Sequence, residues 1–204
     1  VVDSWAAALE SAAPKHVVFL SSAGAEHERG TGPIQVAHYA ETRFKRLPFA
    51  LTALRAAYFQ ENWGAVLPLA AQQGILPSML TPGKKVPMVA TADIGAVAAE
   101  ALRKGPAAAG IIELAGPADY DSAAVAAFVS KTLGKDVQRI DVPEEGFVPA
   151  LTQAGLTPSL AGLIAEMNVA LNRGLIAFKG SPRRGMVGVE ATLAKLLAGG
   201  GAAH

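Results

Sequence analysis

Two adjacent serines stand at the end of the first strongly apolar run of the sequence. Residues 17–20 are all aliphatic or aromatic, and Ser21, Ser22 and Ala23 follow them directly. If the run is a strand of an open parallel sheet, these small residues lie at its carboxyl end, where such sheets bind ligands. They would let a flat ligand approach the backbone, although a plain strand-to-loop turn has the same composition. A nucleophilic serine is disfavoured, because the G-x-S-x-G turn of hydrolases needs a glycine two residues before its serine.

His38 and Glu41 form the second group with chemical potential. They stand three residues apart in a predicted helix over residues 36–46, so they share one helix face. One such pair can contribute to a metal site, but no second cluster of ligands accompanies it, and we predict no metal. His38 could instead give a hydrogen bond or a proton to a ligand, since the pKa of histidine lies near neutrality. The remaining alternative is a solvent-facing histidine beside a structural ion pair.

Aromatic and amide side chains follow the second apolar run, residues 49–55. Tyr58, Phe59 and Asn62 stand there within five residues of one another. An aromatic pair and an amide at the carboxyl end of a strand can wall a planar ring. Buried aromatic side chains at such a turn also commonly belong to the core. We expect the turns after Leu20 and Arg55 to lie side by side and to form the floor for a planar ring.

A glycine pattern near the end of the sequence has a simpler interpretation. Residues 185–191 spell G-x-x-G-x-x-A. A dinucleotide-binding turn must follow a strand and open a βαβ unit, and neither condition is expected here. We interpret the pattern as the entry to the last helix.

The elements that must position these residues alternate between strand and helix, which predicts an α/β fold. The first strand is apolar at every position, which predicts burial on both faces as in a parallel sheet. Thr91 is predicted to cap a helix. The expected strands cover residues 17–20, 49–55, 111–115 and 137–142, with short strands within 74–90, and the expected helices cover residues 3–13, 36–46, 59–72, 91–103, 122–133 and 190–197.

Composition narrows the class of protein. The 204 residues are 51% hydrophobic and 17% charged, with a net charge of +1. This balance argues against direct nucleic-acid binding, which needs a local excess of cations. No apolar run reaches the roughly 18 residues of a membrane span. Cysteine is absent, which removes disulfides, thiol nucleophiles and thiolate metal sites and fits the reducing cytoplasm.

Three segments together resemble the NmrA-like branch of the atypical short-chain dehydrogenase/reductases. They are residues 16–24 with the double serine, residues 41–62, and residues 89–95 before an alanine-rich helix. The resemblance implies a Rossmann-like parallel sheet with a small, mostly helical C-terminal lobe. On this basis residues 1–115 are expected to form a partial NAD(P)-binding domain, residues 116–198 a substrate lobe interleaved with the sheet, and residues 199–204 a flexible tail.

The resemblance also implies a function. Members of this branch bind NADP(H) or NAD(H), and some reduce quinones or azo compounds while others sense the cofactor and regulate transcription factors. The implied activity is hydride transfer to a planar, quinone-like acceptor, and the alternative is a non-catalytic dinucleotide sensor or regulator. The implied site comprises His38 as the catalytic residue, Ser21, Ser22, Ala23, Ala56, Ala57 and Tyr58 at the cofactor, and Phe59 and Asn62 at the acceptor.

The sequence departs from the family pattern in two places. The positions that correspond to the catalytic tyrosine and lysine of standard short-chain dehydrogenases hold Ala37 and Pro33. The glycine-rich turn that holds the pyrophosphate is not found ahead of residues 17–20, so the N-terminal half of the sheet is expected to be missing. The flanks of the two central strands would then be exposed, and we expect a homo-oligomer that covers them.

Overall fold

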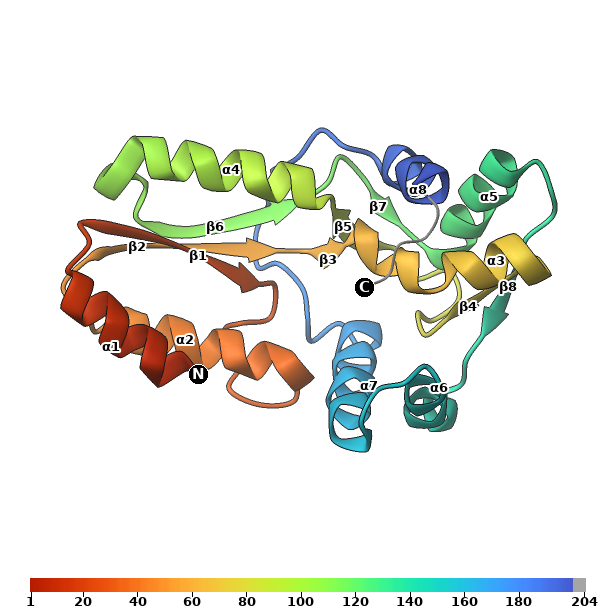
Figure 1. Ribbon diagram of the computed structural model, residues 1–204, viewed down its shortest axis with the longest axis horizontal. Coiled ribbons are helices and arrows are strands. Elements are labelled where there is room, and N and C mark those ends of the chain that lie inside the picture. Colours follow the sequence, from red (N-terminus) through yellow and green to blue (C-terminus); the bar gives the residue numbers. More distant parts are fainter. Residues whose placement is uncertain (200–204) are drawn as a thin grey trace.

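The computed structural model describes residues 1–199 (Figure 1). At its centre lies a four-stranded sheet in the order β1-β2-β6-β9, in which all neighbouring strands are parallel. Its strands are β1 (His16–Ser22), β2 (Ala50–Ala56), β6 (Gly110–Ala115) and the short β9 (Arg183–Arg184). The parallel sheet with its flanking helices confirms the predicted α/β class.

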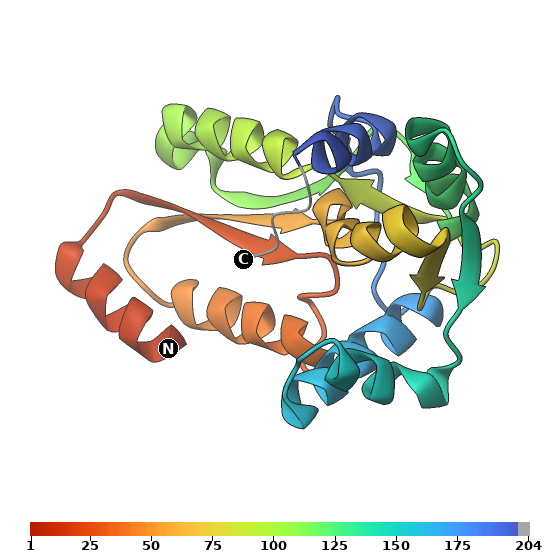
Figure 2. The ribbon, with the colours of Figure 1, turned by 45° about the vertical axis from the view of Figure 1, so that its right-hand side comes forward.

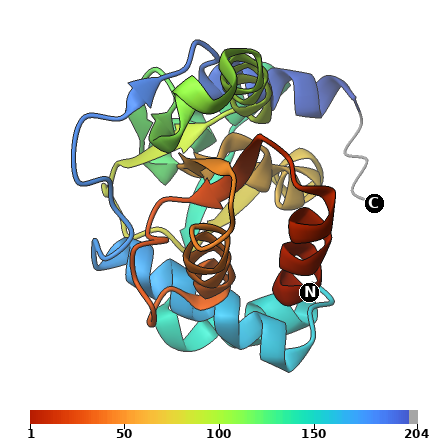
Figure 3. The ribbon, with the colours of Figure 1, turned by 90° about the vertical axis from the view of Figure 1, so that its left-hand side faces the viewer.

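Helices cover both faces of this sheet. Helices α1 (Val2–Ala12) and α2 (Gln35–Phe44) lie on one side and α4 (Thr91–Lys104) on the other (Figure 3). On the first side, the ring of Phe19 meets that of Phe44 edge-on, with ring centroids 5.3 Å apart. On the second side, Ile94 and Val97 of α4 pack with buried residues of β2 and β6. Apolar residues on both faces of the strands are therefore used, as parallel sheets require.

Strand β1 is more exposed than its apolar sequence predicts. Five of its seven residues are only half-buried, and Leu20 is 48% exposed. Within residues 1–199, β1 pairs with β2 alone, so its other edge is open. The expectation of burial on both faces is therefore wrong for β1, whereas β2 is buried along most of its length.

The helix predicted over residues 59–72 is also wrong at its beginning. The chain first forms a two-residue strand, β3 (Tyr58–Phe59), and then a 3-10 helix over Gln60–Ala65. Only the last part is α-helical, as α3 (Leu67–Gln73), with Pro68 in its first turn, where the missing N–H of proline has no cost. Pairing of β3 with β5 (Val86–Val89) overrides the local helix preference.

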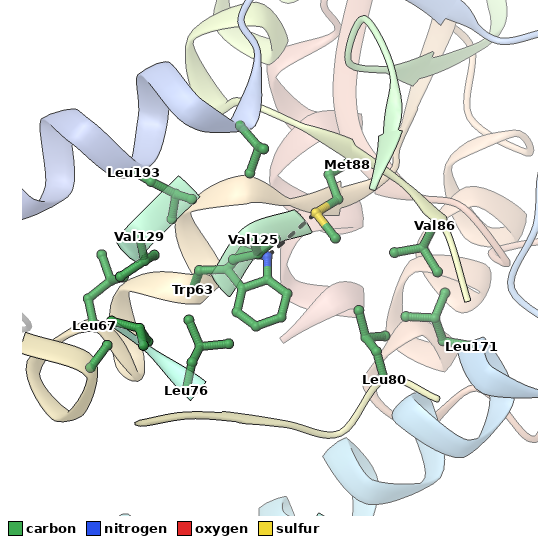
Figure 4. Packing of buried hydrophobic residues seen from close by; sticks show 13 residues of the cluster. Trp63, Leu67, Leu76, Leu80, Val86, Met88, Val125, Val129, Leu171 and Leu193 are labelled. Atoms are coloured by element: carbon green, nitrogen blue, oxygen red, sulfur yellow. Dashed lines mark hydrogen bonds between the residues drawn. The ribbon is translucent and has the colours of Figure 1, made fainter. Parts of the chain in front are cut away.

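A second core lies beyond the end of the main sheet (Figure 4). It is centred on Trp63, whose indole N–H points to the sulfur of Met88 at 3.5 Å. Helices α3, α5 (Ser122–Leu133) and α8 (Val189–Ala198) surround this core. It also includes residues of the short strands β4 (Ile75–Ser78) and β5; β4 pairs with β8 (Gln138–Asp141), and β5 pairs with β7 (Asp119–Tyr120). Residues before and after position 115, where the cofactor domain was expected to end, share this core.

Helices α6 (Phe147–Gln153) and α7 (Pro158–Asn172) pack side by side (Figure 2). Helix α7 also contacts the loop that joins β1 to α2, at the 3-10 turn Gly32–Ile34. Gly32 has a φ of +57°, and a Cβ at this position would lie 2.0 Å from the carbonyl oxygen of Leu163. Only glycine lets the loop approach α7 this closely.

The start of α4 is stabilised differently from the expectation. Thr91 is the first helical residue and not the cap, and the capping position is Ala90. The carboxylate of Glu61 accepts hydrogen bonds from the Thr91 N–H at 2.9 Å and from its hydroxyl at 2.7 Å. A side chain from the 3-10 helix therefore satisfies the free amide at the start of α4.

Within residues 1–199, no helix has both the length and the apolar character needed to cross a membrane. The same residues contain no group of three or more His, Cys, Asp or Glu side chains placed to hold a metal ion. Of the tail expected over residues 199–204, only Gly199 is among the described residues.

Candidate functional site

The turns that follow β1 and β2 lie side by side, as the sequence predicts. Ser21 is in register with Arg55, and Ser22 with Ala56. Beyond the strands, the N–H of Ala23 donates to the carbonyl of Ala56 at 2.9 Å. We call residues 21–25 and 55–58 the paired turns. Parallel pairing brings these residues, which are more than 30 positions apart in the chain, to the same edge of the sheet.

Small side chains make the paired turns a surface of backbone. Ala23, Ala56 and Ala57 are all buried. Gly24 has a φ of +84°, and a Cβ there would lie 3.2 Å from the side chain of Ile176. The turn after β1 therefore lies directly against the segment that follows α7. The side chains of Ile176 and Phe178 from this segment pack on the turn and on the cluster that contains Ala56 and Ala57.

The two serines have different environments. The Ser21 hydroxyl is buried and donates to Glu41 at 2.6 Å. The Ser22 hydroxyl is half-buried and donates to the carbonyl of Ala23 at 3.0 Å. Ser21 therefore contributes to the support beneath the turn, and Ser22 stands nearer to its surface.

A network of buried charges supports the paired turns, and the sequence analysis did not predict it. Arg55 donates to both carboxylate oxygens of Glu41, each at 2.9 Å, and to Glu26 at 2.9 Å. Lys45 adds a contact to Glu41 at 3.3 Å from the edge of the network. We call Ser21, Glu26, Glu41 and Arg55 the charge network. The only sequence signal for it is an arginine at the end of an otherwise apolar strand, which needs a buried partner.

The charge network keeps Glu41 and Arg55 ionised. Burial by itself raises the pKa of Glu41, but hydrogen bonds from Arg55 and Ser21 outweigh this effect and hold the pKa below its usual value. The hydrogen bond to Glu41 likewise raises the pKa of Arg55. A carboxylate held in this way is a poor proton donor near neutral pH. We therefore give the network a structural role beneath the site.

His38 connects α2 to the turn after β1. Its Nδ1 lies 2.9 Å from the carbonyl oxygen of Ala25. A carbonyl can only accept, so Nδ1 carries a proton, and Nε2 accepts a hydrogen bond or donates one when the ring is protonated. The ring is half-buried, and this contact fixes its orientation beside the paired turns. This orientation leaves Nε2 free to act as a donor or acceptor without releasing the turn.

The aromatic rings of Tyr58 and Phe59 do not gather in one place, whereas the Asn62 side chain lies close to the Tyr58 phenol. Tyr58 packs toward the second core, with its ring centroid 6.1 Å from that of Trp63, and burial raises the pKa of its phenol to about 12. Phe59 packs against the cluster that contains Ala56 and Ala57. Asn62 is exposed. Successive residues of a strand point to opposite faces, and this separates the two aromatic rings.

A cleft of about 290 Å³ lies next to the paired turns. Ile176 and Phe178 line it, and both residues also contact the paired turns or the cluster beneath them. The segment that carries them was not predicted to take part in the site. It lies about 120 residues after β2 in the chain, so no local pattern could place it there.

Asp93 holds the segment that follows Phe178 in the chain. Its carboxylate accepts from the N–H groups of Met186 and Val187 at 3.1 and 3.0 Å. A Cβ at Gly185 would lie 2.3 Å from the same carboxylate. We call residues 183–188 the strap. The expectation that no strand precedes the glycine pattern is wrong, since β9 pairs with β6, but the pattern does lead into the last helix, α8.

Comparisons with known proteins identify the family and the fold of the chain. A family model described as the NmrA-like family matches residues 6–173. Quinone oxidoreductase 2 of Escherichia coli (strain K12) is 30% identical over 123 residues, which are 60% of this chain and 43% of that protein. This chain thus spans less than half the length of the curated relative it matches.

Two solved structures show the fold. The NADPH-dependent quinone oxidoreductase of Escherichia coli, crystallised with NADPH, aligns with a TM-score of 0.77 at 23% identity, over 96% of this chain and 70% of that one. The triphenylmethane reductase of Citrobacter sp. aligns with a TM-score of 0.77 at 18% identity, over 97% of this chain and 70% of that one. The fold of the present chain is therefore Rossmann-like.

Proposed function

The chain belongs to the NmrA-like family, and from this premise we propose that it acts in NAD(P)H-dependent reduction of a planar acceptor of the quinone or azo type. The observation that carries the proposal is the pair of adjacent turns, which present buried alanines and backbone at the carboxyl edge of the sheet. Ligands of open α/β sheets bind at this edge. Quinone oxidoreductase 2 of Escherichia coli, a relative that is 30% identical over 123 residues, supports the proposal.

The residues of the paired turns fit the nicotinamide end of NADP(H) or NAD(H). Ala23, Ala56 and Ala57 have small, buried side chains, and the half-buried Ser22 hydroxyl stands next to them. In this proposal Ser21 and Tyr58 support the cofactor surface from below. When bound, a nicotinamide cofactor supplies the hydride, and the protein aligns the rings.

The acceptor is proposed to lie over the same turns, toward the cleft. Phe59 and Phe178 pack on the alanine cluster and can limit where the acceptor ring lies, with the exposed Asn62 at the margin. The protonated ring of His38 is proposed to give its Nε2 proton to the reduced acceptor, while the Nδ1–H keeps its contact with Ala25 and the ring becomes neutral. Reduction of a quinone to the hydroquinone requires one proton in addition to the hydride, so an oriented imidazolium has a direct use.

Cofactor binding is the first test. Trp63 is buried and Trp5 is 48% exposed, so titration with NADPH and with NADH can be followed by tryptophan emission. We expect saturable quenching below about 1 mM, followed by loss of the nicotinamide absorbance when a simple quinone is added. Binding without turnover would favour the dinucleotide-sensing alternative, and no binding at all would contradict the proposal for this chain.

Substitution of His38 tests its role. His38→Gln is expected to lower kcat at least tenfold, toward the lower end of the roughly 10²–10⁴ typical of acid–base groups, with little change in the KM for the cofactor. His16→Gln is the matched control, because His16 contacts Thr52 at the amino end of the sheet. An unchanged kcat in His38→Gln would mean that His38 only connects α2 to the turn after β1.

We also propose that the chain self-associates. Within residues 1–199 one edge of β1 is unpaired, and Trp5, Leu20 and Tyr39 are each 48% exposed on or near the elements around it. Open strand edges and exposed apolar side chains favour association. Light scattering across a range of protein concentrations is expected to show a mass above that of one chain, and a constant monomer mass would contradict this.

A further inference from the structure

The cleft next to the paired turns carries cations that the protein does not neutralise. Lys84, Lys85 and Arg184 line it together with a single carboxylate, Asp119. Arg184 pairs with Asp119 at 2.7 Å and also donates to the carbonyl of Gly116 at 3.1 Å. Neither lysine has a carboxylate within ion-pair distance anywhere in residues 1–199. The cleft therefore has a surplus of positive charge.

The turn that carries the two lysines is anchored to α7. The Lys84 N–H donates to the carbonyl of Thr81 at 3.0 Å, and the Thr81 N–H donates to the Asn172 side chain at 3.0 Å. Asn172 in turn donates to the carbonyl of Met79 at 2.7 Å. Val86, which follows Lys85 in the chain, is buried in the second core. The lysines thus project from a turn of defined shape.

Lys84 is half-buried, and Lys85 is exposed. The Lys84 amine lies over the end of α7, 4.0 Å from the position that a Cβ would take at Gly174. The negative end of the α7 dipole favours a cation there, but it amounts to about half a charge and leaves room for an anion. A partly desolvated ammonium without an ionic partner binds anions more strongly than one in open water.

The other wall of the cleft is apolar and is shared with the proposed site. Ile176 lies against Gly24 of the first paired turn, and Phe178 packs on the cluster that contains Ala56 and Ala57. A molecule that lies on Ile176 and Phe178 is therefore separated from the paired turns by one layer of side chains. Its charged end would point toward Lys84 and Lys85.

We propose that this cleft binds an aromatic anion, a ring that carries a carboxylate or sulfonate group, separately from the acceptor proposed over the paired turns. Lys84 and Lys85 contact the anion, and Phe178 and Ile176 contact the ring. The volume of about 290 Å³ lies just below the roughly 300–1,000 Å³ of small-molecule pockets, which favours one or two fused rings.

Binding of a redox-inert probe tests the cleft without any turnover. Naphthalene-2-sulfonate and the neutral 2-naphthamide are titrated calorimetrically into the wild-type chain and the Lys84→Met/Lys85→Met double variant. We expect the variant to lose about tenfold or more in affinity for the sulfonate, with less than a twofold change for the amide. Lys15→Met removes one lysine charge before the amino end of β1, away from the cleft, and is expected to leave both affinities unchanged.

The binding results decide the proposal in either direction. Equal affinity of the wild-type chain for the two probes would overturn it, as would an unchanged sulfonate affinity in the double variant. Circular dichroism and thermal unfolding of the double variant show whether it remains folded. Lys84→Arg/Lys85→Arg keeps the charges and is expected to retain sulfonate binding.

Kinetics add the second arm. The KM of the double variant for NADPH is expected to equal that of the wild-type chain. An increased KM for NADPH would mean that the lysines bind the cofactor phosphate, and the proposal would fail. Probe binding as expected without any quinone turnover would contradict the proposed function and leave the anion site standing.

Discussion

Two groups of charged side chains lie near the carboxyl edge of the central sheet, and the protein pairs them to very different degrees. In the charge network, Glu41 and Arg55 are buried, and each charged group has hydrogen-bonding partners within 3 Å. In the cleft, Lys84 and Lys85 have no carboxylate within ion-pair distance in residues 1–199. The two groups are joined by the segment that carries Ile176 and Phe178.

The difference follows from solvent access and separates support from recognition. A buried charge without a partner costs several kcal/mol, so the charges under the paired turns must satisfy one another. Charged groups that bond one another have little hydrogen-bonding capacity left for a ligand. The lysines of the cleft have access to water, which is partial for the half-buried Lys84, and can exchange water for an anion at lower cost. Paired charges here position the backbone, and unpaired charges are those available for binding.

Loss of Arg55 is expected to have the largest effect on stability. Arg55→Met leaves the carboxylate of Glu41 buried with only Ser21 and the partly exposed Lys45 as partners. We expect the free energy of unfolding to fall by about 3–5 kcal/mol, as for other broken buried pairs. Urea unfolding measures it.

An exposed ion pair provides the matched control for Arg55. Arg173 pairs with Glu144 at 3.0 Å, and its side chain is 69% exposed. Arg173→Met is expected to cost no more than about 1 kcal/mol. Equal losses for the two variants would show that burial of the charge network does not matter, and the contrast drawn above would be lost.

The strap next to the cleft gives a second, smaller effect. Gly185→Ala would place a Cβ 2.3 Å from the Asp93 carboxylate, which holds the strap through Met186 and Val187. We expect a loss of about 1–3 kcal/mol in thermal unfolding, typical of added atoms in a packed site. Gly180→Ala is the control, because no atom lies within 4 Å of a Cβ at that position. If both variants unfold like the wild type, the strap does not hold the wall of the cleft in place.

The smallest expected effect is on the pH dependence of the free energy of unfolding. Arg55 and Ser21 hold the pKa of Glu41 below its usual value of 4.5 in the folded chain. The ionised carboxylate therefore stabilises the fold above that value, and this contribution is lost as the pH falls through the lower, folded-state pKa. Urea unfolding between pH 6 and pH 3 should show a shallower acid-side decline in Glu41→Gln than in the wild type. Parallel curves would mean that Glu41 does not contribute to the acid response.

Much of the fold could be predicted because its signals are local. The helix Ser122–Leu133 ends at Gly134, as its left-handed conformation requires, and β2 lies within a residue of the predicted run. The position of the paired turns followed from one general rule, since parallel strands bring their carboxyl ends to the same edge. The exposure of β1 and the strand at Tyr58 could not be read in this way, because both depend on which strands lie alongside.

Local sequence patterns could not predict the groups that support the site. Glu41 and Arg55 are 14 residues apart and meet only because α2 packs on β1 and β2. Asp93 meets Met186 across 93 positions. Phe178 was not expected near the alanines at all, and no spacing in the sequence marks it.

The sequence alone determined the alternation of strand and helix, the ends of most elements and the small residues after the first two strands. These depend on periodicity, on chain stiffness and on the special conformations of glycine and proline, which act over a few residues. The tertiary structure alone decided which charges were neutralised and which were left for a ligand. That depends on distance and on access of water, and both arise only when segments remote in the chain are packed together.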